Sequence, residues 1–78
     1  MLRLVESIKV QDGVIYNLEH HHERMDSSVY KLTGEKNRIN LSDELTVPVE
    51  YFTGLYKCRV VYRESIELVE FIPYLRRD

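Results

Sequence analysis

The segment 17–32 shows the hydrophobic spacing of an α-helix. Its apolar residues are separated by seven, four and three positions, which places them on one helix face: Leu18, Met25, Val29 and Leu32. At about 100° per residue they form a stripe roughly 60° wide, and Arg24 lies near its border. Asn17 can cap the helix start, and Gly34 can end it in a left-handed conformation. We therefore expect the only long helix of the chain at Asn17–Leu32.

Before this segment, alternation predicts a β-hairpin. Every second residue of the first strand except residue 6 is apolar, namely Leu2, Leu4, Ile8 and Val10. Glu6 falls on the same face, and an unpaired buried charge is costly. We therefore expect its carboxylate to accept hydrogen bonds from backbone N–H groups or to meet a nearby cation. Asp12-Gly13 is a turn signal, and Val14–Tyr16 is the expected return strand.

A second hairpin is predicted at Leu55–Tyr74. Its first strand alternates between two sets of side chains, Tyr56, Cys58, Val60 and Tyr62 against Lys57, Arg59, Val61 and Arg63. A two-residue turn at Glu64-Ser65 would place Arg59 opposite Glu70 and Val60 opposite Val69. Phe71 then joins the apolar face, whereas Ile66, Leu68 and Ile72 join the face of Arg59. That second face is mixed, which indicates partial cover by something outside this chain.

Between the helix and the second hairpin the pattern is weak. Ser42-Asp43-Glu44 can begin a helix of one or two turns, which Pro48 limits. The order β-β-α-(short α)-β-β predicts an α+β fold: an antiparallel β-sheet of about four strands with one long helix packed on one face. We expect one domain, 1–78, in which the helix packs its stripe against the second hairpin, specifically Met25, Val29 and Leu32 against Tyr56, Val60 and Phe71.

Composition narrows the class of protein. With 44% hydrophobic and 31% charged residues, the 78-residue chain has the composition of a soluble globular domain. A net charge of −2 provides no field that attracts nucleic acid. No apolar run is long enough for a signal peptide or a membrane span, and the single Cys58 excludes an internal disulfide. We expect a cytoplasmic protein that binds neither nucleic acid nor membrane.

Few residues suggest chemistry when they are taken singly. His22 and Asp26 lie one helical turn apart, but a zinc site needs a third ligand, so we expect no metal site. Cys58 faces the apolar side of its strand, which favours a buried thiol over a catalyst. Arg24 and Arg59 alone are typical surface cations. No phosphate-binding glycine loop, serine-nucleophile motif or paired-carboxylate spacing is present.

Taken together, the motifs resemble a known family. Val5-Glu6-Ser7-Ile8-Lys9-Val10, Asp12-Gly13, and then Asn17-Leu18-Glu19 with His21-x-x-Arg24-Met25 resemble the N-terminal small domain of class IV aminotransferases. These are fold-type IV pyridoxal-phosphate enzymes, and the closest branches are aminodeoxychorismate lyase-like and branched-chain aminotransferase-like. The family pattern is F-E-T-[IL]-R, then a glycine, then L-x-x-H-x-x-R-[LM]. This chain departs from it at Val5, Ser7 and Lys9. Leu55–Tyr62 resembles the following strand, and Phe71-x-Pro73-Tyr74 its partner.

The resemblance implies roles for four residues. Arg24 would bind the cofactor phosphate, His21 would be its companion, and Arg59 with Lys57 would face the substrate. None of them is catalytic. The lysine that binds the cofactor covalently belongs to the family's large domain, and no lysine here lies in a matching motif. The chain is thus expected to be a fragment or truncated form, with weak or no pyridoxal-phosphate binding and no catalysis alone.

Two hypotheses follow. In the first, the chain is the small domain of a class IV aminotransferase or aminodeoxychorismate lyase, whose partner is the C-terminal domain or a second copy in a homodimer. In the second, it is a non-enzymatic α+β interaction module that uses the mixed face of the second hairpin. An in-frame continuation carrying the lysine domain would favour the enzyme.

Overall fold

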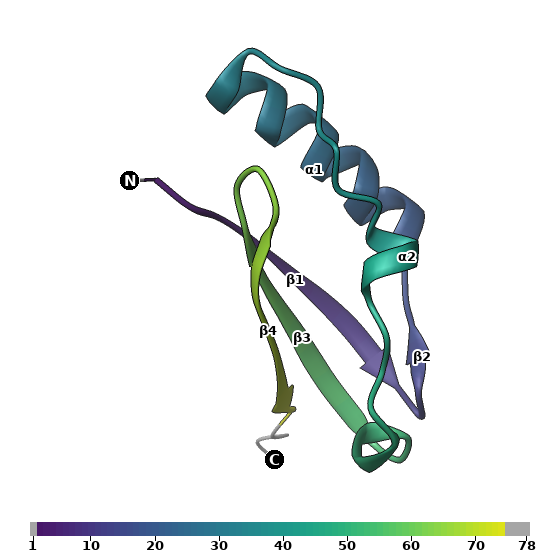
Figure 1. Cartoon of the computed structure of the whole chain (residues 1–78). Helices are drawn as coiled ribbons and strands as arrows, with labels where there is room; N and C mark the ends of the chain where they lie inside the picture. Colours follow the sequence, from purple (N-terminus) through teal and green to yellow (C-terminus); the bar gives the residue numbers. More distant parts are fainter. Residues whose placement is uncertain (1, 75–78) are drawn as a thin grey trace.

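A computed structural model describes residues 2–74 as one antiparallel sheet with a helical layer on one face (Figure 1). The strands lie in the order β2-β1-β3-β4, with bounds β1 Leu4–Gln11, β2 Val14–Ile15, β3 Leu55–Tyr62 and β4 Ile66–Pro73. Between β2 and β3 come the helix α1, the short helix α2 and a 3-10 turn η1, at Leu18–Thr33, Leu41–Glu44 and Val49–Tyr51. The predicted α+β fold and its element order are confirmed, with η1 as an addition.

The first hairpin follows the expected alternation. Glu6, Ile8 and Val10 of β1 are buried, whereas the residues between them are exposed. Asp12 and Gly13 both have positive φ, 50° and 80°, as a two-residue hairpin turn requires. Asp12 also accepts a hydrogen bond from the Gly54 N–H through Oδ1 at 2.9 Å, which ties this turn to the start of β3.

The second hairpin has the predicted register over most of its length. Arg59 lies opposite Glu70, and Val60 lies opposite Val69. Near the turn the register shifts, so that Tyr62 lies opposite Ile66 and three residues, 63–65, make the connection. The predicted two-residue turn and the predicted face of Ile66 are therefore wrong. One extra residue in β4 reverses the side on which Ile66 points, and it packs on the core.

The core lies between the sheet and the helical layer. From α1 it takes His21, Met25 and Val29, and from the connection after α1 it takes Ile39, Leu41 and Leu45. Met25 and Val29 share this core with Val60, as predicted. Leu32 is only partly buried and does not belong to it. Tyr56 and Phe71 are partly buried against this core, and their rings also meet Tyr51 of η1, with both centroid distances at 4.9 Å.

The ends of α1 differ in how well they were predicted. Gly34 ends the helix at φ 74°, and its N–H donates to the Tyr30 carbonyl oxygen, as expected. Asn17 has φ 55° and its side chain makes no capping hydrogen bond, so the predicted cap is wrong. Asn17 adopts a left-handed backbone conformation in place of the extended conformation that is typical of a capping residue.

Candidate functional site

The most unusual group of the core is the Glu6 carboxylate, which is only 3% exposed. Glu6 Oε1 lies 2.7 Å from Nδ1 of His21, and Glu6 Oε2 lies 3.8 Å from Nη2 of Arg24. Because residues three apart are neighbours on a helix surface, α1 presents both groups to the same point of β1. The prediction that Glu6 meets a cation is confirmed. Burial explains the arrangement, since a carboxylate away from water needs hydrogen-bond donors.

His21 and Arg24 contribute differently to this cluster. The His21 ring is buried, and a hydrogen bond of 2.7 Å joins its Nδ1 to Glu6 Oε1, which fixes the ring orientation. Arg24 keeps 58% of its side chain exposed and approaches Glu6 at ion-pair distance, beyond a direct hydrogen bond. A guanidinium has five N–H donors, so Arg24 can face Glu6 and still bind an anion from outside.

Tyr62 of β3 completes the cluster from the sheet. Burial and the Glu6 charge raise the pKa of its hydroxyl, while Ser28 and Arg24 act in the opposite direction. The hydroxyl is buried and has no hydrogen bond of acceptable geometry among the described residues, although the Ser28 side chain lies near it. Tyr62 is a site residue that sequence reasoning missed. Its place in the alternation showed that it faces the core, but not which polar groups it meets there.

Arg59 and Lys57 lie on the other face of the sheet. Arg59 Nη1 donates to Glu70 Oε1 at 2.7 Å, and Lys57 stands directly opposite Lys9 of β1. Neighbouring Cys58 points into the core and is fully buried. The structure therefore brings His21 and Arg24 together through Glu6, but it separates them from Arg59 and Lys57 by the thickness of the sheet. The four residues form no single site within this chain.

The other candidate groups are Cys58, His22 and Asp26. Burial raises the pKa of Cys58 to about 11, so its sulfur is a thiol rather than a nucleophilic thiolate near neutral pH. His22 Nε2 lies 3.7 Å from Asp26 Oδ2. Within residues 2–74 no group of three or more His, Cys, Asp or Glu side chains is arranged to hold a metal ion. A hollow between α1 and α2 has Glu19 in its lining but not Arg24, and a carboxylate there opposes phosphate binding.

Over the same residues, none of the helices combines the length and apolar character needed to cross a membrane. Comparison of the chain with known protein families, with curated proteins and with solved structures found no match.

Proposed function

We propose that this chain is the small domain of a pyridoxal-phosphate enzyme of the class IV aminotransferase type, an aminotransferase or an aminodeoxychorismate lyase. One observation carries the proposal. The glutamate of the strand motif and the histidine and arginine of the helix motif are separated by 15 and 18 residues, yet their side chains meet at 2.7 and 3.8 Å. The two motifs that carry the resemblance thus form one polar cluster.

In this proposal Arg24 binds the phosphate of the cofactor. Its planar guanidinium matches two phosphate oxygens, and its exposure leaves it accessible from outside the chain. The Glu6 charge draws the guanidinium toward one side, so that fewer of its conformations remain to be lost on binding. Glu6 is held in turn by His21, which makes His21 a positioning residue. The donor set fits a phosphate, but the described residues do not enclose one.

In this proposal the covalent lysine and the substrate region are supplied by a large domain or a second copy of the chain. Pyridoxal phosphate supplies an electron sink when it is bound, and the covalent lysine of such enzymes lies in their large domain. A large domain or a second copy would also have to join Arg24 to a substrate region, because Arg59 and Lys57 lie on the opposite face. This chain alone is therefore proposed to bind the cofactor weakly and to turn over no amino acid.

A titration with a cofactor analogue tests the role of Arg24. 4′-Deoxypyridoxine 5′-phosphate lacks the aldehyde, so lysines cannot react with it, and 4′-deoxypyridoxine lacks the phosphate as well. We expect the phosphorylated analogue to shift the NMR signals of Arg24 and its α1 neighbours, with a Kd no tighter than about 1 mM. The shifts should vanish in Arg24→Gln and persist in Arg38→Gln, which removes an equal charge from an exposed position.

Two results would contradict the assignment. One is an equal response of Arg24 to the analogue without phosphate. The other is an undiminished response of α1 in the Arg24→Gln variant. Saturable binding at micromolar concentrations would contradict the narrower statement that the chain alone is a weak binder.

A further inference from the structure

The sheet face opposite α1, called the open face below, is built of cross-strand rows from β1, β3 and β4. Val5, Val61 and Leu68 form an apolar row. Four positions further along β1, Lys9 and Lys57 stand opposite each other and form the lysine pair. Between these rows lie Arg59 and Glu70. The face thus combines a strip of aliphatic surface with a pair of ammonium groups.

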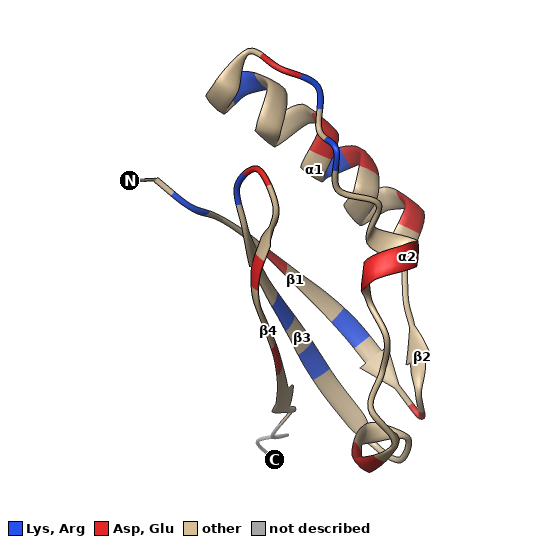
Figure 2. Ribbon diagram, in the orientation of Figure 1, with Lys and Arg blue, Asp and Glu red and all other residues tan. Residues whose placement is uncertain are grey.

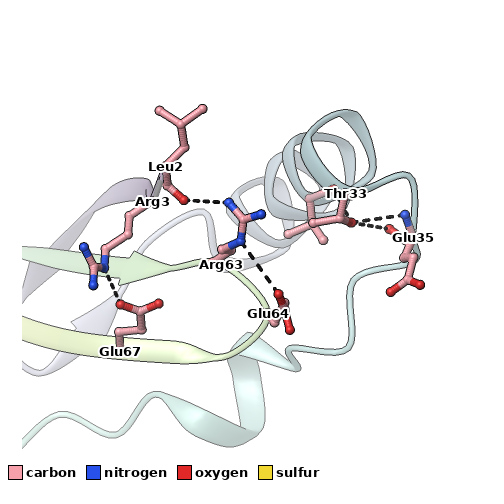
Figure 3. A network of polar contacts seen from close by, with 8 residues as sticks. Leu2, Arg3, Thr33, Glu35, Arg63, Glu64 and Glu67 are labelled. Carbon is pink, nitrogen blue, oxygen red and sulfur yellow. Dashed lines mark hydrogen bonds and ion pairs between the residues drawn. The ribbon is translucent and has the colours of Figure 1, made fainter.

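The cations of this face differ in how they are compensated. Toward the β3–β4 turn, Arg3 donates to Glu67, and Arg63 donates to the Leu2 carbonyl oxygen at 2.8 Å (Figure 3). Arg59 is paired with Glu70. Lys9 and Lys57, in contrast, form no ion pair with any residue between 2 and 74. Lys9 Nζ lies 4.8 Å from the centre of the Tyr16 ring, which attracts the ammonium but leaves its charge in place.

Repulsion within the lysine pair lowers the folding stability of the isolated chain. Like charges directly opposite each other on neighbouring strands repel, and an intervening carboxylate would convert this repulsion into attraction. The acidic residues Glu67 and Glu70 of β4 are already paired with Arg3 and Arg59. Figure 2 shows further Asp and Glu along α1 and α2, and Lys and Arg on β1 and β3. The helical layer lies on the other side of the sheet (Figure 1), so those carboxylates do not reach the pair.

The apolar row is available to the same partner. Val5 and Leu68 are 44% and 45% exposed, and they flank Val61, which is 8% exposed. Covering the two outer side chains would remove aliphatic surface from water, which favours association. A partner that paired with the two lysines and also covered the apolar row would need carboxylates beside aliphatic side chains.

We propose that the open face docks an acidic polypeptide, whose carboxylates lie between Lys9 and Lys57 and whose aliphatic side chains cover Val5 and Leu68. Charge complementarity selects this occupant. A second copy in a closed twofold arrangement of open faces would bring four lysines together, which is unfavourable. The proposal does not depend on pyridoxal phosphate or on Arg24, which lies on the other side of the sheet.

Selection from a phage-displayed library of random peptides tests the proposal without a known partner. The wild-type chain should enrich peptides in which Asp or Glu alternates with Leu, Ile or Val. The Lys9→Glu/Lys57→Glu variant keeps two like charges opposite each other and should instead enrich peptides rich in Lys or Arg. The matched control, Lys31→Glu/Lys36→Glu, changes two exposed lysines outside the sheet and should select the same acidic peptides as the wild type.

A synthetic copy of one enriched peptide then allows affinities to be measured. The Lys9→Glu/Lys57→Glu variant and a Leu68→Ser variant should each weaken its binding by about tenfold or more. Circular dichroism and urea unfolding of each variant establish that it is folded, so that lost binding reports on the surface.

Several results would overturn the proposal. They are the enrichment of no peptide, the enrichment of basic peptides by the wild type, and acidic peptides whose binding is unaffected by Lys9→Glu/Lys57→Glu. Concentration-dependent self-association that this variant abolishes would identify a second copy as the occupant. Binding to phosphatidylglycerol vesicles, lost in the same variant and accompanied by no peptide selection, would identify an anionic membrane.

Discussion

The two faces of the sheet differ in whether their charged side chains have partners of opposite charge within the chain. On the face that α1 packs against, called the covered face below, one carboxylate, Glu6, lies within reach of His21 and Arg24 of α1. On the open face, two ammonium groups, Lys9 and Lys57, face each other and have no carboxylate partner in the described part of the chain. Burial requires a chain to compensate its own charges, because water cannot do so. Exposure removes that requirement, so uncompensated charge on the open face is free to serve an external partner.

The largest expected difference between the faces concerns packing. Met25→Ala should lower the free energy of unfolding by about 2–5 kcal/mol, because Met25 is fully buried. Val5→Ala removes aliphatic surface from the open face and should cost less than about 1 kcal/mol. Urea unfolding of both variants measures the difference. Equal losses would mean that the open face is covered in solution, and a loss below about 0.5 kcal/mol for Met25→Ala would mean that α1 faces another way.

The next effect concerns the compensation of Glu6. His21→Ala leaves one buried carboxylate oxygen without its donor and should cost about 1–3 kcal/mol. His20→Ala is the control, because His20 is adjacent and exposed, and it should change stability by less than about 0.5 kcal/mol. Replacing both partners, in Glu6→Leu/His21→Leu, should restore much of the loss. If the double variant is as unstable as His21→Ala, the carboxylate is not the source of the penalty.

The third effect is the pH dependence of stability, which reports on the exclusion of water from the covered face. Burial raises the pKa of Cys58 from 9.0 to about 11, and burial also raises the pKa of Tyr62. The folded chain therefore keeps protons that the unfolded chain has already lost, so stability should fall as the pH rises from about 9 to 11. Urea unfolding across this range measures the slope. Cys58→Ala should flatten it in part and leave the contribution of Tyr62, whereas an unchanged slope would show that the thiol does not contribute.

The smallest effect is expected at the lysine pair. Lys57→Thr removes the cross-strand repulsion and places a β-branched residue in a strand, which should stabilise the chain by about 0.2–1 kcal/mol. The gain should shrink as salt screens the charges of the wild type. Lys36→Thr, in the connection after α1, is the control and should show no salt-dependent gain. A loss of stability in Lys57→Thr at low salt would contradict the account of the open face.

Periodicity predicted the parts of the fold that depend on one strand or one helix. The alternation in β1 and β3 identified the covered face, and it placed Arg59 and Lys57 on the other face. The spacing in α1 identified Met25 and Val29 as core residues. The three-residue turn was not predictable from alternation, because one extra residue changes the pairing without changing the composition.

The candidate site was predictable only in part. A carboxylate on an apolar strand face indicated that Glu6 needs a partner, and the spacing of His21 and Arg24 put both on neighbouring helix positions. Which cation reaches which strand depends on how α1 lies across the sheet, and this orientation is set by tertiary packing. For the same reason the sequence did not reveal that Tyr62 joins the cluster, or that Leu32 lies outside the core.

We propose above that Arg24, on the covered side of the sheet, recognises the phosphate of pyridoxal phosphate, and this proposal is the one to test first. The most direct measurement is an NMR titration with 4′-deoxypyridoxine 5′-phosphate that compares Arg24→Gln with Lys57→Gln, one variant for each side of the sheet. The account predicts that the phosphate-dependent shifts disappear in Arg24→Gln and remain in Lys57→Gln. Shifts that survive in Arg24→Gln and disappear in Lys57→Gln would place phosphate recognition on the open face and contradict it.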